Sequence, residues 1–122
     1  MPIGALGNAG RSAFHLLRRL KEELQVNSTC GASNVSFGLP NRHGLNAAFL
    51  AMAGLAGMTS AIMNPLHLEE MQGVMGADVM LGKDEHCRRW LARFREAPAE
   101  GSAAAGARAD RNERRRRREG TG

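Results

Sequence analysis

The sequence VNSTCGASNVSF, at residues 26–37, predicts a short buried strand that runs into a loop. Small and β-branched residues dominate it, and the turn-forming GLPN at residues 38–41 follows. A second short run, SAIMN at residues 60–64, is also typical of a strand and is stopped by Pro65. Each predicted strand therefore gives way to a loop near an asparagine, Asn34 in the first and Asn64 in the second.

Helical spacing of apolar residues surrounds these two strands. Residues 10–24 predict a surface helix with one buried stripe, and a second helix is predicted from Leu45, with Gly57 suited to end it. The stripe of the first helix is Phe14, Leu17, Leu20 and Leu24, and that of the second is Leu45, Ala48, Phe49, Met52 and Leu55 or Ala56.

Two further helical segments are predicted at residues 68–75 and 85–95. The second is expected to bury Trp90, Leu91 and Phe94. Helix, strand, helix, strand is the order found in parallel α/β sheets, so the predicted fold class is α/β.

Length and composition set further bounds. The chain has 122 residues, whereas a complete (β/α)8 barrel takes about 250 residues. Residues 97–122 are rich in Ala, Gly and Arg and are expected to be a disordered tail. Their seven arginines and four acids carry +3 of the formal net charge of +5, and without stacking aromatics they predict only nonspecific attraction to nucleic acid. No run approaches the roughly 18 apolar residues of a membrane helix and no secretory leader is visible, so a cytoplasmic protein is expected.

Most other chemistry-bearing residues have a structural interpretation. Cys30 and Cys87 lack metal-site spacing and are expected to be reduced thiols, and no metal site is predicted. Asp78 and Asp84 are interpreted as a helix-end acid and an N-cap. The four histidines show no catalytic pairing in the sequence, and the one nearest the first loop, His43, is expected to be a solvated turn residue. The four histidines of the chain are His15, His43, His67 and His86.

The ends of the strands are the candidate ligand site. Parallel α/β barrels bind ligands at the C-terminal ends of their strands, here at Ser33-Asn34 and Met63-Asn64. An asparagine amide offers both donors and acceptors, as a fused heteroaromatic ring with amide-like edges requires. For Asn64-Pro65, a plain strand terminator and a ligand-facing role both remain open.

The amino-acid sequence of the first loop is a more specific signal than the polar residues at the strand ends. The sequence GASNVSFGLPNR at residues 31–42, with Leu45-Asn46 and the later AIMNP at residues 61–65, resembles the last two βα units of pterin-binding methyltransferases. That family includes the methyltetrahydrofolate:corrinoid methyltransferases and the folate-binding module of cobalamin-dependent methionine synthase. The resemblance covers residues 1–96 and implies the C-terminal part of a dihydropteroate-synthase-like (β/α)8 barrel.

The resemblance also implies roles for individual residues. Asn34 matches the asparagine that hydrogen-bonds the pterin near the nitrogen carrying the methyl group, and it is the residue expected to act in catalysis. The expected substrate-binding residues are Ser33, Asn34, Phe37, Arg42 and Asn64. Methyltetrahydrofolate would be the substrate, and cobalamin would be carried by a partner corrinoid protein.

Departures from the family pattern limit this interpretation. The pterin-holding acids of the family come from earlier strands, which have no counterpart here, so the implied site is half built. Exposed sheet edges predict association, as a homodimer or with the missing N-terminal half. Two alternatives are a dihydropteroate synthase, disfavoured because the second strand ends without the expected Arg and His, and an inactive fragment with a nonspecific basic tail.

Overall fold

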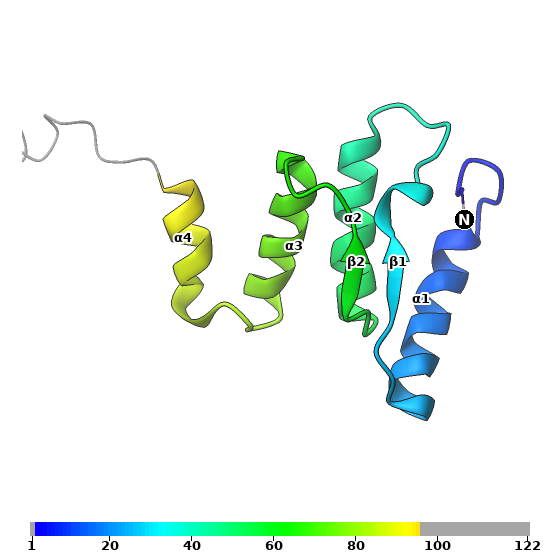
Figure 1. The fold of residues 1–122 in the computed structure, drawn as a ribbon, viewed down its shortest axis with the longest axis horizontal. Coiled ribbons are helices and arrows are strands. Elements are labelled where there is room, and N and C mark those ends of the chain that lie inside the picture. The colour runs from blue at the N-terminus through cyan, green and yellow to red at the C-terminus, as the bar shows by residue number, and fades with distance from the viewer. Residues whose placement is uncertain (1, 96–122) are drawn as a thin grey trace, which may run out of the picture.

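The computed structural model describes residues 2–95 of the chain, and the predicted disordered tail at residues 97–122 lies outside them. In Figure 1 the elements follow one another in a row, from α1 through the small sheet and α2 to α3 and α4. The helices are α1 (Ala9–Arg19), α2 (Arg42–Leu55), α3 (Leu68–Met80) and α4 (Arg88–Phe94), and the strands are β1 (Thr29–Gly31) and β2 (Ser60–Ile62). No helix among these residues is long and apolar enough to cross a membrane.

The sheet consists of β1 and β2, which pair in parallel with α2 as the connection between them. Thr29 pairs with Ser60, Cys30 with Ala61 and Gly31 with Ile62. The first strand is shorter than predicted, because the chain turns through a 3-10 segment at Ala32–Asn34 directly after Gly31. Since the strands are parallel, the loops that follow them lie at one edge of the sheet. The α/β class is thus confirmed on a small scale.

A compact apolar cluster joins α1 to α2. Leu17, Ala53 and Ala56 form its buried centre, with Phe14, Phe49 and Met58 packed around them. The Phe14 and Phe49 rings stack with their centroids 5.6 Å apart. Gly57 then ends α2 with a φ of +108°, the left-handed conformation expected of a glycine C-cap.

Three of the predicted buried stripes are wrong in detail. In α2, Ala48, Met52 and Leu55 are exposed, whereas Ala56, the predicted alternative to Leu55, is buried. The buried side chains within the helix are Asn46, Leu50 and Ala53, because α2 packs between α1 and α3. The C-terminal residue of the first stripe, Leu24, is 63% exposed. In α4, Trp90 and Phe94 are only half-buried, with their rings against each other, and Leu91 is exposed.

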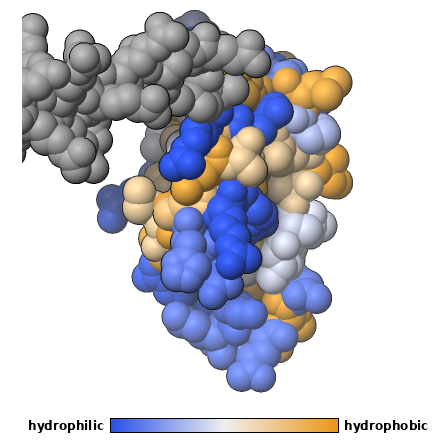
Figure 2. All heavy atoms as spheres, turned by 90° about the vertical axis from the view of Figure 1, so that its left-hand side faces the viewer, coloured by the Kyte–Doolittle hydropathy of each residue, from blue (hydrophilic) through white to orange (hydrophobic). Residues whose placement is uncertain are grey.

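Many apolar side chains remain outside the core. Ile62 of β2 and Met52 and Leu55 of α2 are among the large hydrophobic residues that are more than half exposed. Figure 2, which views the α4 end, shows hydrophilic side chains over the middle and lower part of that face, with hydrophobic ones mainly toward its margins. Exposed apolar side chains that form a contiguous patch are typical of interaction surfaces. Association with a second copy or with further strands stays a prediction.

The contact between α2 and α3 depends on the absence of a side chain at Gly73. A Cβ atom at this position would lie 2.7 Å from the backbone oxygen of Ala47 and 2.9 Å from its Cβ. Neither neighbour is a flexible side-chain end, so the helices could accept a larger residue only by moving apart. Gly76, one turn further along α3, has ordinary clearance, with its nearest neighbour at 3.6 Å in the Trp90 ring.

We expect Gly73→Ala to destabilise the fold by about 1–3 kcal/mol, because overpacking outweighs the roughly 1 kcal/mol that alanine gains in helix propensity. Gly76→Ala is the matched control and should be neutral or stabilising, because only the propensity changes there. Urea denaturation followed by circular dichroism measures both. Equal effects of the two variants would contradict the close α2–α3 contact.

The start of α4 is capped from outside the helix by Asp84. Its carboxylate accepts hydrogen bonds from the backbone N–H groups of Arg89, at 3.0 Å, and Trp90, at 2.9 Å. The bond from Arg89 is the largest influence and, with that from Trp90, holds the pKa of Asp84 below its usual value despite partial burial. The interpretation of Asp84 as a capping acid is confirmed. Asp78, in the last turn of α3, pairs with the Arg89 guanidinium at 3.1 Å.

The lowered pKa means that Asp84 stabilises the fold above its unfolded-state pKa of about 3.9, and that this stabilisation is lost as the pH falls through its lower folded-state pKa. Asp84→Ala should therefore lower the melting temperature at pH 7, and the difference from wild type should shrink below about pH 3.9. Glu85→Ala, which removes a neighbouring exposed acid, is the control. A pH-independent difference for Asp84→Ala would show that the carboxylate charge plays no part.

Candidate functional site

A polar cavity lies where the two strands give way to their helices. It has a volume of about 330 Å³ and opens at the C-terminal edge of the sheet. Its walls come from the turn after β1, the first turns of α2 and α3, and the segment after β2. The lining residues are Ser33, Arg42, His43, Asn46, Met63, Asn64, His67 and Glu70.

The buried carboxylate of Glu70 is the centre of this site. It lies in the first turn of α3, where the positive end of the helix dipole favours a negative charge, and the residue is only 2% exposed. Its Oε1 atom lies 2.9 Å from Asn46 Nδ2, 3.0 Å from His43 Nδ1 and 3.2 Å from His67 Nδ1. Burial by itself raises the pKa of Glu70, but the hydrogen bonds from these three side chains outweigh it, so that the pKa is lowered. Glu70 is therefore a carboxylate at neutral pH.

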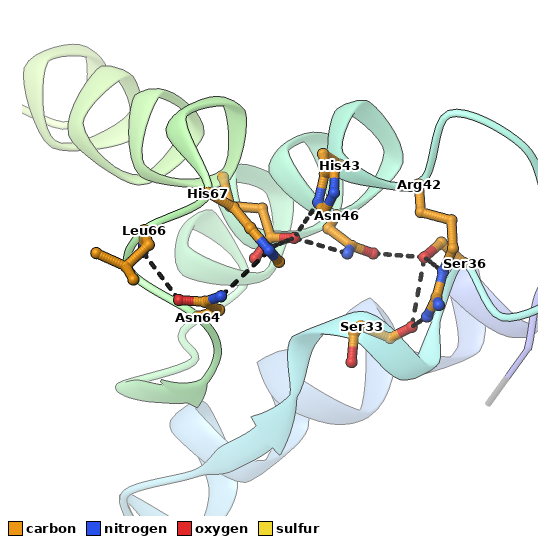
Figure 3. Close-up of polar contacts among 9 residues, drawn as sticks. Ser33, Ser36, Arg42, His43, Asn46, Asn64, Leu66 and His67 are labelled. Atoms are coloured by element: carbon orange, nitrogen blue, oxygen red, sulfur yellow. Dashed lines mark hydrogen bonds and ion pairs between the residues drawn. The ribbon is translucent and has the colours of Figure 1, made fainter.

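A relay of hydrogen bonds connects Glu70 to the loop after β1 (Figure 3). The Arg42 Nε–H donates to Ser36 Oγ at 3.1 Å, the Ser36 hydroxyl donates to Asn46 Oδ1 at 2.7 Å, and Asn46 donates to Glu70. Ser36 and Asn46 are both almost fully buried. Every donor in this relay points toward the carboxylate, so the bonds polarise one another in the same direction.

His43 and His67 meet in space. The expectation that His43 is solvated is confirmed, since its side chain is 47% exposed, but its assignment to a turn is wrong. It lies in the first turn of α2, and its ring centroid is 4.0 Å from that of His67. Asn64 Nδ2 lies 3.2 Å from His67 Nε2. If this amide donates to Nε2, the His67 proton must be on Nδ1, from which it donates to Glu70. The two histidines thus complete the shell around the carboxylate.

The structure brings three of the predicted site residues into this cavity: Ser33, Arg42 and Asn64. Arg42 holds the loop in place, since its Nη2 also donates to the backbone oxygen of Ser33 at 2.8 Å. Asn64 forms an Asx turn after β2, because its Oδ1 accepts the backbone N–H of Leu66 at 3.0 Å. The residue also lines the cavity, and its ligand-facing role stays a prediction.

Asn34 and Phe37 lie elsewhere. Asn34 lines a separate, mainly apolar cavity of about 250 Å³ between α1 and β1. Its side chain lies close to Gly31, where a Cβ atom would be 2.9 Å from Asn34 Nδ2, the end of an exposed side chain. Phe37 is 69% exposed, with the Arg42 guanidinium 5.9 Å from its ring centroid. Both residues follow β1, but neither lines the Glu70 cavity.

Sequence reasoning missed His43, Asn46, His67 and Glu70 as a group. A signal was present in the sequence. His67 and Glu70 are three residues apart at the start of a predicted helix that follows the second strand. His43 lies just before the predicted helix that follows the first strand. Parallel strands place both helix starts at one edge of the sheet. Only the assignment of α2 from Leu45 rather than Arg42 hid this relation.

No protein-family model matches the chain. The chain is 38% identical over 71 residues to the methylcorrinoid:tetrahydrofolate methyltransferase of Eubacterium limosum. The match takes in 58% of this chain and 26% of that protein, so the chain spans about a quarter of the length of this relative.

The buried polar network should contribute measurably to stability. Asn46→Ala leaves both the Ser36 hydroxyl and the Glu70 carboxylate short of a buried partner, and an unsatisfied buried group costs about 1–3 kcal/mol. We expect a loss of about that size in urea denaturation. Asn27→Ala, which replaces an exposed asparagine before β1, should change stability by no more than about 0.5 kcal/mol. Similar losses in the two variants would argue against the network.

Proposed function

We propose that the chain is part of a pterin-binding methyltransferase that transfers a methyl group between methyltetrahydrofolate and a corrinoid protein. The observation that carries the proposal is the similarity to the Eubacterium limosum methyltransferase, together with polar side chains gathered at the C-terminal edge of a parallel sheet. Ligands bind at this edge in α/β barrels. On this proposal the two βα units belong to a (β/α)8 barrel.

The polar groups of the site suit a pterin, whose ring offers both donors and acceptors. The Asn64 amide and the Ser33 hydroxyl line the cavity, and Arg42 fixes the loop that carries Ser33. The Asn34 side-chain amide lines the neighbouring cavity beside α1, where it would offer donors and an acceptor to a ligand. Phe37, exposed beside Arg42, would add an apolar contact to a bound ring.

Asn34 would act on the ring nitrogen that carries the methyl group. A tertiary amine is a poor leaving group, so transfer requires positive character on that nitrogen, and a polar group already in place stabilises the charge as it shifts. The amide cannot supply a proton as an acid does. Its role would be to orient the ring and to organise hydrogen bonds around the nitrogen. The corrinoid cobalt, carried by the partner protein, would be the other site of methyl attachment.

Titration calorimetry with methyltetrahydrofolate tests this proposal. We expect saturable binding by the chain and a roughly 2- to 10-fold weaker affinity for Asn34→Ala, which corresponds to one hydrogen bond of about 0.5–1.5 kcal/mol. Asn27→Ala is the matched control, because it removes the same amide from an exposed position at the opposite end of β1.

A second arm adds the N-terminal portion of the Eubacterium limosum relative as a separate polypeptide, to supply further strands. Binding that appears only in this mixture, and that depends on Asn34, would support the family and the half-site together. Absence of binding in both arms would overturn the pterin proposal. Methyl transfer to reduced cobalamin, followed by its visible absorbance, would then be measured on whichever species binds.

A further inference from the structure

Three potential metal ligands converge in the cavity around Glu70. They are His43, His67 and Glu70, and one ligand atom from each lies within 4.8 Å of the other two. The Glu70 Oε1 atom is 3.0 Å from His43 Nδ1 and 3.2 Å from His67 Nδ1. In a tetrahedral zinc site with bonds of about 2.0–2.1 Å, neighbouring ligand atoms lie about 3.3 Å apart. The two distances to the carboxylate already match that spacing.

We propose that His43, His67 and Glu70 form a three-ligand site for a divalent transition metal ion, with zinc as the best fit. Two imidazoles and one carboxylate suit zinc, whereas magnesium and calcium prefer oxygen ligands. Three protein ligands leave a fourth position, and the cavity lined by Ser33, Met63 and Asn64 provides space for water or a ligand oxygen there. Such an open position is typical of catalytic rather than structural zinc sites.

The surroundings of the three ligands support a metal ion electrostatically. Glu70 brings a buried negative charge, and its Oε1 atom lies within hydrogen-bond distance of the Asn46 amide and of the two histidine rings. An ion in place of the two imidazole protons would neutralise this charge at close range. Asn46 would keep its hydrogen bond to Oε1, and a hydrogen bond of this kind orients a carboxylate that binds a metal.

Metal binding has a structural consequence at Asn64. When His67 binds metal through Nδ1, its proton must sit on Nε2, and the Asn64 Nδ2 atom at 3.2 Å can no longer donate to it. Metal binding would therefore break the Asn64–His67 hydrogen bond, because an amide that turned over to accept the Nε2 proton through Oδ1 would lose the hydrogen bond from the Leu66 N–H. This couples the ion to the segment after β2.

The site does not depend on the proposed methyl transfer, because metal binding is measured directly and without folate. The competing explanation is a purely hydrogen-bonded cluster, in which both histidines donate to Glu70 and no ion binds. The two free cysteines and the remaining histidines are other places where zinc could bind. Burial raises the pKa of the Cys30 thiol, which weakens it as a metal ligand.

The test uses the full chain with Cys30→Ser and Cys87→Ser as background, freed of metal by a chelator. Zinc chloride is titrated by calorimetry, and the zinc retained after gel filtration is measured by mass spectrometry. We expect one zinc ion per chain, and at least tenfold weaker binding for His43→Ala and for His67→Ala. The control variants His15→Ala and His86→Ala remove exposed histidines outside the cluster and should bind zinc as the background does. Magnesium chloride should give no binding.

His43 is half exposed, so its replacement by alanine should leave the fold intact, which far-UV circular dichroism verifies. Cobalt(II) provides an independent readout, since a tetrahedral site gives visible absorption bands that should disappear in His67→Ala. The proposal is overturned if no stoichiometric zinc binds, or if binding is equally strong in His43→Ala and His67→Ala. It is also overturned if His15→Ala or His86→Ala abolishes the binding.

Discussion

A buried carboxylate needs partners, and the need to satisfy Glu70 organises the C-terminal edge of the sheet. Removing a carboxylate from water without compensation is prohibitive, so the structure surrounds it with Asn46, His43 and His67. Two of these partners come from α2 and one from the N-terminus of α3. The carboxylate therefore fixes how the two helices meet at this edge and holds the loop after β1 through Ser36 and Arg42.

The close contact between α2 and α3 at Gly73 helps to hold the two helices in the positions that the Glu70 site requires. Gly73 lies three residues after Glu70, on the same side of α3, and its lack of a side chain lets α3 approach the backbone of Ala47. Ala47 directly follows Asn46, the residue that donates to the carboxylate. Close packing and polar recognition are thus supplied by neighbouring residues of the same two helices. A substitution that moves the two helices apart at Gly73 would therefore also disturb the hydrogen bond between Asn46 and Glu70.

The loop after β1 has two sides with different chemistry. Arg42 anchors Ser33 and Ser36 toward the Glu70 cavity, while Asn34 lies over Gly31 and lines the cavity next to α1. A ligand that contacts both Asn34 and Asn64 would therefore have to lie across the end of β1 rather than inside the Glu70 cavity. The two-stranded sheet leaves this end open, and large apolar residues such as Ile62 remain exposed beside it. Further strands paired with β1 or β2 would narrow this opening.

The amino-acid sequence by itself determined the features that depend on nearby residues. The alternation of helices and strands, the glycine stop at Gly57 and the capping role of Asp84 follow from local periodicity and local hydrogen bonds. The meeting of Ser33 and Asn64 at one edge follows from the parallel order. Only the tertiary structure decided which face of α2 is buried, and it grouped His43 with Glu70 and turned Asn34 away from Arg42. The contacts of His43 and Asn46 with Glu70 join residues 27 and 24 positions apart, and no local pattern specifies them.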